Sequence, residues 1–367
     1  MFGFLNAVTT PAEAESMVGR VALPGTAVSL ADAGTRARVA LEGTRAAVSL
    51  VVGVPIAATR ADLEESVRQA LRAGGLDAGH LDIQQRIAAH APQGSLVPLP
   101  RVRNIIAVGS GKGGVGKSTT AVNLALALAA DGARVGLLEA DVYGPSIPTM
   151  LGLSGRPDSP DGKSIEPMKA HGIEAMSIGL MVEQDTPMIW RGPMATSALT
   201  QLLEQTLWGG EGGLDYLVVD LPPGTGDIQL TLAQKIPVAG AVVVTTPQEV
   251  ATLDARKAVR MFEKVDVPVL GLVENMAVHV CTHCGHAEHL FGEGGGARMA
   301  DTYGVPLLGS LPLERVIREQ GDVGVPVVAY APDSATATAY RHLARNVAAH
   351  LAARPRAPVS IGASLLG

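Results

Sequence analysis

Aromatic residues are scarce in this sequence, which restricts how its core can be built. They make up 3% of the 367 residues, whereas hydrophobic residues as a whole make up 47%. The core must therefore consist mainly of Ala, Val, Leu and Ile, a composition typical of α/β proteins with buried parallel strands. A chain of this length is also long enough for two domains.

Cysteine is scarcer still. The chain has 2 cysteines, Cys281 and Cys284, in the spacing C-x-x-C. Two thiols in a chain of this size do not make a disulfide framework, so the sequence predicts a redox-active or metal-binding pair.

Long basic runs and long apolar runs are both missing. The net charge is −6, and no patterned stripe of Lys and Arg indicates a nucleic-acid surface. The longest apolar candidate, residues 121–138, is interrupted by Asn123, Asp131 and Arg134, which makes it unsuited to crossing a membrane. We find no secretory signal at the N-terminus. We therefore expect a soluble, cytoplasmic protein that binds neither nucleic acid nor membrane.

The most informative segment that is present is glycine-rich and spans residues 109–120. From Gly111 onward it fits the pattern G-x-x-x-x-G-K-[ST] in full. An apolar run at 104–108 precedes it as a buried strand would, and a helical pattern follows it to about Asp131. This order predicts a phosphate-binding loop for ATP. The predicted nucleotide-binding residues are Gly111, Lys112, Gly113, Gly114, Val115, Gly116, Lys117, Ser118 and Thr119.

Within this loop, individual side chains have distinct expected roles. Lys117 would bridge the outer phosphates, and the Ser118 hydroxyl would bind Mg²⁺. Lys112 is a second lysine that the general pattern does not require.

Acidic residues follow two predicted strands. Asp220 ends the apolar run at 216–219, where a carboxylate can hold Mg²⁺, and Asp141 follows a strand at 135–139, where it can act as general base toward the attacking water. Each acid also has a plainer interpretation as a helix cap or loop residue.

The two thiols leave their metal open. A closed zinc site needs four ligands, and His279, His283, His286 and His289 are near Cys281 and Cys284 in the sequence. A symmetric dimer would instead bring together four thiolates, which suits a [4Fe–4S] cluster.

Along the chain, the composition indicates two structured parts. Residues 1–90 indicate a small α+β domain, with a hairpin within 36–54, a helix after Thr59 and a closing strand at 81–87. Residues 91–100 indicate a Pro-rich linker. Residues 101–351 predict a doubly wound α/β domain with a mostly parallel sheet, a P-loop NTPase, and residues 352–367 predict a flexible tail. Further strands are expected at 214–220, 239–246 and 269–273, and a helix at 251–265.

Taken together, the motifs resemble a known family. Residues 111–119 resemble the deviant Walker A motif of the MinD/ParA/nitrogenase-iron-protein class, whose hallmark is the additional lysine. Residues 101–350 as a whole resemble the Mrp/ApbC iron–sulfur cluster carriers. Six segments carry that resemblance: 141–147, 220–227, 274–276, 281–284, 291–296 and 309–313.

The resemblance implies roles that spacing alone does not give. It implies that Lys112 reaches the phosphates of a partner subunit, that Asn275 contacts adenine, and that Cys281 and Cys284 share a [4Fe–4S] cluster with the same pair in a homodimer. It further implies slow ATP hydrolysis, and apo iron–sulfur proteins and scaffold proteins as partners. Where the family commonly has Asp-Ala-Asp, this chain has Glu139, which is longer by one methylene, and residues 1–90 resemble an accessory domain without its cysteine.

Two other functions fit parts of the pattern. A spatial-organising ATPase of the ParA/MinD kind would need a basic patch or an amphipathic membrane helix, and the uncharged end of the chain at 357–367 offers neither. A zinc-stabilised structural dimer would use the same thiolates without transferring a cluster.

Overall fold

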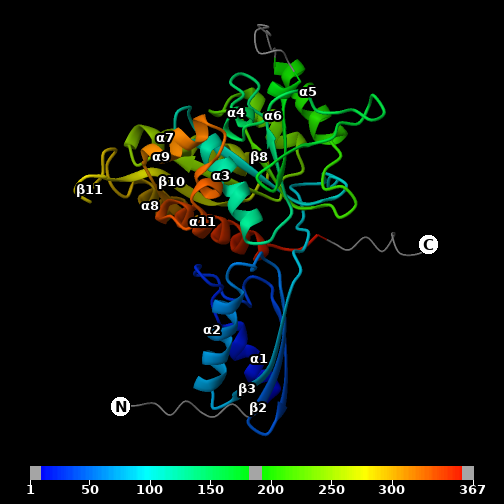
Figure 1. The fold of residues 1–367 in the computed structure, drawn as a ribbon, viewed down its shortest axis with the longest axis vertical. Coiled ribbons are helices and arrows are strands. Elements are labelled where there is room, and N and C mark those ends of the chain that lie inside the picture. Colours follow the sequence, from blue (N-terminus) through cyan, green and yellow to red (C-terminus); the bar gives the residue numbers. More distant parts are fainter. Residues whose placement is uncertain (1–9, 182–191, 358–367) are drawn as a thin grey trace.

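Two separate β-sheets organise the chain. The computed structural model describes residues 10–181 and 192–357. Near the N-terminus lies a sheet of three strands, and the remainder forms around a sheet of nine strands. Figure 1 shows the smaller sheet and its two helices as a lobe of their own beside the larger α/β part.

The small sheet is a hairpin extended by one parallel strand. Strands β1 (Arg36–Glu42) and β2 (Arg45–Val52) pair antiparallel around Gly43, which has a φ of 61°. Alternate residues of β2 are buried, so one face of the sheet contacts helices while the other faces solvent. Helices α1 (Pro11–Gly19) and α2 (Arg60–Ala73) supply that cover.

Strand β3 (Asp77–Gln85) pairs parallel to β2 and begins earlier than the expected 81–87. Its first four residues, 77–80, include only one hydrophobic side chain, Ala78, and none of the four is buried. Backbone pairing with β2 extends the strand over them without a hydrophobic alternation that the sequence could show.

The large sheet is mostly parallel. Its strands are β4 (Val102–Ser110), β5 (Val135–Glu139), β6 (Met168–Ala170), β7 (Ile173–Ser177), β8 (Leu214–Asp220), β9 (Gly240–Thr245), β10 (Val269–Val280), β11 (Ala287–Glu288) and β12 (Leu307–Pro312). Their order is β11-β10-β9-β4-β8-β5-β7-β6, with β12 also paired to β10. Only the β6–β7 and β10–β11 pairs of the described sheet are antiparallel. The predicted doubly wound, mostly parallel α/β fold is confirmed, with β4 at the point where the chain changes direction across the sheet.

Helices cover both faces of this sheet. One face is covered by α3 (Lys117–Ala130), α4 (Ile147–Met150), α9 (Arg315–Asp322), α10 (Val327–Tyr330) and α11 (Ala335–Ala352). The other is covered by α5 (Gly192–Gln205), α6 (Asp227–Lys235), α7 (Glu249–Lys264) and α8 (Gly295–Tyr303). The core is aliphatic, as the composition predicts, and the core of the small lobe is continuous with the face that carries α3 and α11. Among residues 10–181 and 192–357, no helix is long and apolar enough to cross a membrane.

The segment between the two sheets is anchored to the larger one. The His90 backbone N–H donates to Asn104 Oδ1 over 3.0 Å, and the buried Gln93 amide donates to the carbonyls of Ala233 and Ile236. Beyond α11, Arg356 forms an isolated antiparallel β-bridge with His90. Residues 358–367 of the expected tail lie outside the described residues. The division of the chain into a small domain at 1–90, a linker at 91–100, an ATPase domain at 101–351 and a tail at 352–367 stays a prediction.

Candidate functional site

The glycine-rich loop joins the end of β4 to the start of α3. Gly114 and Gly116 have φ angles of 79° and 77°, which side-chain-bearing residues rarely adopt. At Gly111 a Cβ atom would lie 2.0 Å from the Asp254 carbonyl oxygen of α7. The loop therefore requires glycine at 111 for close packing and at 116 for backbone conformation, and it presents N–H groups at the N-terminus of a 14-residue helix.

Lys117 and Asp220 form a buried ion pair at the base of the loop. Lys117 Nζ lies 2.6 Å from Asp220 Oδ1 and 3.2 Å from Ser118 Oγ, and the two side chains of the pair are 5% and 0% exposed. Strands β4 and β8 are neighbours, which brings these residues together. Burial raises the pKa of the Asp220 carboxyl, and the Lys117 ammonium opposes that rise.

The residues present fit a hard cation at this point. Asp220 Oδ2 is buried and has no hydrogen-bond partner among the described residues, and the Ser118 hydroxyl is adjacent. Carboxylate and hydroxyl oxygens are the ligands that Mg²⁺ prefers.

Asp141 lies on the loop that follows β5, where its Oδ1 accepts a hydrogen bond from the Tyr143 backbone N–H over 3.3 Å. It lines an open cavity of about 710 Å³ together with the glycine-rich segment 222–227. That segment is tied to the phosphate loop because the Gly224 N–H donates to the Ser110 carbonyl over 3.0 Å. The structure therefore brings Asp141 and the segment after Asp220 to one cavity beside the loop.

Glu139 has a structural role that the sequence did not predict. Its Oε1 accepts hydrogen bonds from the backbone N–H groups of Ser146 and Ile147, and its Oε2 accepts one from Ser177 Oγ. Burial raises its pKa to about 7, against the hydrogen bond from Ser146. Glu139 thus anchors the loop that carries Asp141. Ser146 and the proline that follows at 148 mark the start of α4 in the sequence, and the free backbone N–H groups of a helix start could have indicated such a carboxylate contact.

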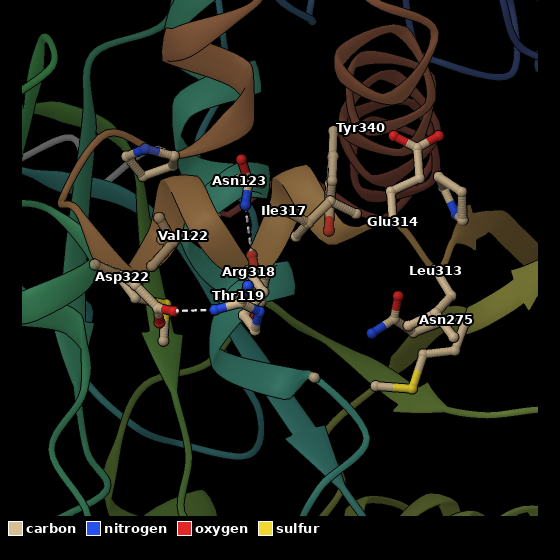
Figure 2. Close-up of a pocket in the computed structure, with 16 residues that line it drawn as sticks. Thr119, Val122, Asn123, Asn275, Leu313, Glu314, Ile317, Arg318, Asp322 and Tyr340 are labelled. Atoms are coloured by element: carbon tan, nitrogen blue, oxygen red, sulfur yellow. Dashed lines mark hydrogen bonds and ion pairs between the residues drawn. The ribbon is translucent and has the colours of Figure 1, made fainter. Parts of the chain in front are cut away.

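A second cavity, of about 220 Å³, begins where the phosphate loop ends (Figure 2). Gly116 and Thr119 border it on one side, and Leu313, Glu314 and Ile317 border it on the other. Asn275 also lines it and donates through Nδ2 to the Val115 carbonyl over 2.8 Å, which holds the loop against β10. The cavity is the natural place for the base and sugar of a nucleotide whose phosphates lie in the loop.

Cys281 and Cys284 lie at the far end of the strand that carries Asn275. Strand β10 continues past the expected 273 to Val280, and a turn closed by the Gly285 N–H on the Cys281 carbonyl leads into β11. Cys281 is half-buried and Cys284 is exposed, and both thiols are free. Backbone hydrogen bonds from Cys284 and His283 lower the pKa of the Cys281 thiol, which favours the thiolate that metals bind.

Within the described residues, no complete metal site surrounds these thiols. Over the described ranges, no three His, Cys, Asp or Glu side chains are grouped so as to hold a metal ion. The Nδ1 atoms of His279 and His289 instead donate hydrogen bonds to the carbonyl oxygens of Leu313 and Ala277, over 2.9 and 2.7 Å. Lys112 is similarly uncommitted, because it forms no ion pair within the part of the chain that the structure describes.

Known proteins resemble this chain over most of its length. Residues 101–348 match the ParA family described as NUBPL iron-transfer P-loop NTPase. The iron–sulfur cluster carrier protein of Pseudomonas fragi is 58% identical over 272 residues, which cover 74% of this chain and 94% of that protein. The protein of the same name from Escherichia coli (strain K12) is 61% identical over 251 residues, 68% of this chain and 67% of that protein.

A solved structure supports the same assignment. The nucleotide-binding protein from Archaeoglobus fulgidus in complex with ADP is 39% identical, with a TM-score of 0.56, and the match covers 64% of this chain and 90% of that one. The resemblance to the Mrp/ApbC carriers is thereby confirmed. This chain belongs to the family of NUBPL iron-transfer P-loop NTPases.

Proposed function

We propose that the protein is an ATP-hydrolysing carrier that binds a [4Fe–4S] cluster between two copies of the chain and passes it to apo-proteins. The observation that carries this proposal is the course of β10, which bears Asn275 at the nucleotide cavity and leads directly to Cys281. Relatives that are 58% and 61% identical are named iron–sulfur cluster carriers, which supports the same function here.

On the nucleotide side, the phosphates of ATP would lie on the N–H groups of residues 111–119 at the start of α3. Lys117 would exchange its bond to Asp220 for the outer phosphates, and Ser118 and Asp220 would hold Mg²⁺. When bound, this cation neutralises charge that develops on the phosphates. Asp141 would accept a proton from the attacking water.

On the cluster side, two incomplete sites call for a second subunit. Cys281 and Cys284 supply two of the four thiolates that a [4Fe–4S] cluster takes, and a two-fold axis supplies the others. Lys112, without an ion-pair partner in the described part of its own chain, would contact the partner's phosphates. Nucleotide-dependent movement between subunits would change how tightly the thiolates hold the cargo.

The proposed cellular location and partners follow from the proposed iron–sulfur cluster. We place the protein in the cytoplasm, where thiols remain reduced, with apo iron–sulfur proteins and scaffold proteins as its partners. A spatial-organising ATPase is less well supported, because the relatives at about 60% identity are named as carriers.

Anaerobic reconstitution with iron and sulfide tests the function. We expect the wild type to develop the visible absorption of an iron–sulfur cluster, and Cys281→Ser and Cys284→Ser to lose it. Thr282→Ala, in the same turn, is the matched control and should retain it. Metal analysis showing zinc alone, or cysteine variants that keep the chromophore, would refute cluster carriage.

A further inference from the structure

Tyr340 has a hydroxyl group whose situation the proposed function does not yet explain. It belongs to α11, it is 0% exposed, and its side chain lines the 220 Å³ cavity beside the phosphate loop. Its hydroxyl has no hydrogen-bond partner among the described residues. Figure 2 shows the ring extending from α11 into the cavity, between Ile317 and Glu314.

Such a hydroxyl needs a partner. A buried polar group left unpaired costs roughly 1 to 3 kcal/mol, so native structures rarely keep one without a reason. Burial, together with the nearby charge of Glu314, raises the pKa of the Tyr340 phenol. The group therefore stays protonated and is able both to donate and to accept.

Three other polar side chains of the cavity, and Asp322 with them, already have protein partners. Glu314 Oε2 accepts from the Thr336 hydroxyl over 2.5 Å. Asn123 accepts from the Val328 N–H through Oδ1 and donates to the Thr119 carbonyl through Nδ2. Arg318 pairs with Asp322 over 2.8 Å. Tyr340 thus keeps a buried, uncommitted polar atom beside a wall that Val122 and Ile317 make largely apolar.

The position of the hydroxyl decides which part of a ligand it meets. Because the cavity begins at Gly116 and Thr119, a nucleotide whose phosphates lie at Gly116 and Lys117 would extend its sugar and base into it. A flat base with polar ring edges suits an apolar wall that carries one hydroxyl. We propose that the Tyr340 hydroxyl hydrogen-bonds the purine base of the bound nucleotide; this rests on the nucleotide binding of the proposed function.

Calorimetric titration of the full chain with two probes tests the inference. ADP carries the base, whereas inorganic tripolyphosphate engages the phosphate loop alone. Tyr340→Phe removes only the hydroxyl, so we expect its Kd for ADP to rise about five- to tenfold and its Kd for tripolyphosphate to stay within about twofold of the wild type. Without ligand, Tyr340→Phe should melt no lower than the wild type, because an unpaired buried group has been removed.

Tyr216→Phe is the matched control, since Tyr216 is buried in β8 and does not line the cavity; it should leave both affinities unchanged. Equal ADP affinity in Tyr340→Phe and wild type would overturn the inference, and so would a parallel loss for both probes, which indicates a structural role. If the wild type binds neither probe, or Lys117→Ala weakens neither, nucleotide binding itself is refuted, and this inference with it.

Discussion

The two lysines of the phosphate loop have different surroundings. Lys117 is buried and paired with Asp220, whereas Lys112 is half-buried and has no ion pair within the described chain. The spacing of the motif predicted both positions, because its glycines and lysines are defined residue by residue. It did not predict that Lys117 rests on Asp220, since that pair joins residues 103 positions apart.

Alanine substitution separates the two lysines. Lys117→Ala should weaken ATP binding by roughly 100-fold, because a charge-assisted contact with phosphate is worth about 3 kcal/mol. Lys112→Ala should keep most of the binding and lose at least about tenfold in turnover, because in the proposed dimer its charge would act on the partner's nucleotide. Titration and steady-state ATPase assays measure the two effects. Equal turnover in Lys112→Ala and wild type would count against a role across the dimer.

Glu139 makes the stability of the fold depend on pH. Its folded-state pKa of about 7 lies above the ordinary 4.5, so the protonated carboxyl stabilises the fold, and that contribution is lost as pH rises from about 4.5 through 7. Glu139→Gln keeps the acceptor for Ser146 and remains neutral. As the pH rises from about 5 to 8, the wild type should lose roughly 2 to 3 kcal/mol in the free energy of unfolding that the variant keeps.

Urea unfolding at the two pH values measures this difference. Glu263→Gln, at an exposed glutamate on α7, is the control and should show almost no change. A Glu139→Gln variant whose stability follows the wild type at every pH would show that Glu139 is not the titrating group.

At the scale of elements, the phosphate loop is fixed by its contact with α7. Gly111→Ala would place a methyl group 2.0 Å from the Asp254 carbonyl, so the loop or the helix must move. We expect a loss of about 3 kcal/mol or more in unfolding free energy. Gly113→Ala, in the same loop, meets nothing closer than 3.9 Å and should cost less than about 1 kcal/mol. Chemical denaturation compares them, and equal stabilities would refute this packing argument.

Strand β10 shows what a sequence pattern cannot reveal about an element. The apolar run predicts a strand at 269–273, but the strand continues to Val280 through an irregular pairing with β12. Met276, within that irregularity, has a φ of 57°, a conformation that no hydrophobic pattern marks in advance. The extension carries the chain from Asn275 to Cys281 as a strand, which the hydrophobic pattern did not predict.

At the scale of the whole molecule, the two lobes meet at Asp131. This residue is 1% exposed, accepts hydrogen bonds from Arg345 of α11 over 2.9 and 3.3 Å, and through its carbonyl accepts one from the Ala57 N–H of the small lobe. The alternation of strands and helices predicted the large sheet, because its strands are nearly continuous apolar runs. The junction was not predictable, since it depends on single polar pairs distant in sequence; even the Pro-rich segment, expected to be a linker, is held by Gln93.

Removing the Asp131 carboxylate should weaken the packing of α11 against the end of α3. Asp131→Ala leaves the Arg345 guanidinium largely buried and unpaired, so we expect a loss of roughly 3 kcal/mol in unfolding free energy. Glu263→Ala, which breaks an exposed ion pair, should change it by less than about 1 kcal/mol. Calorimetry of the full chain checks the comparison, and an Asp131→Ala variant as stable as the wild type would show that the buried Asp131–Arg345 ion pair contributes little.

The central claim is that two copies of the chain share one cluster, and native mass spectrometry of the anaerobically reconstituted protein tests it most directly. The proposal predicts a dimer that carries a single [4Fe–4S] cluster, one for every two chains, and no cluster-bearing species in Cys281→Ser. A cluster on a single chain, or a dimer that holds zinc in its place, would contradict it.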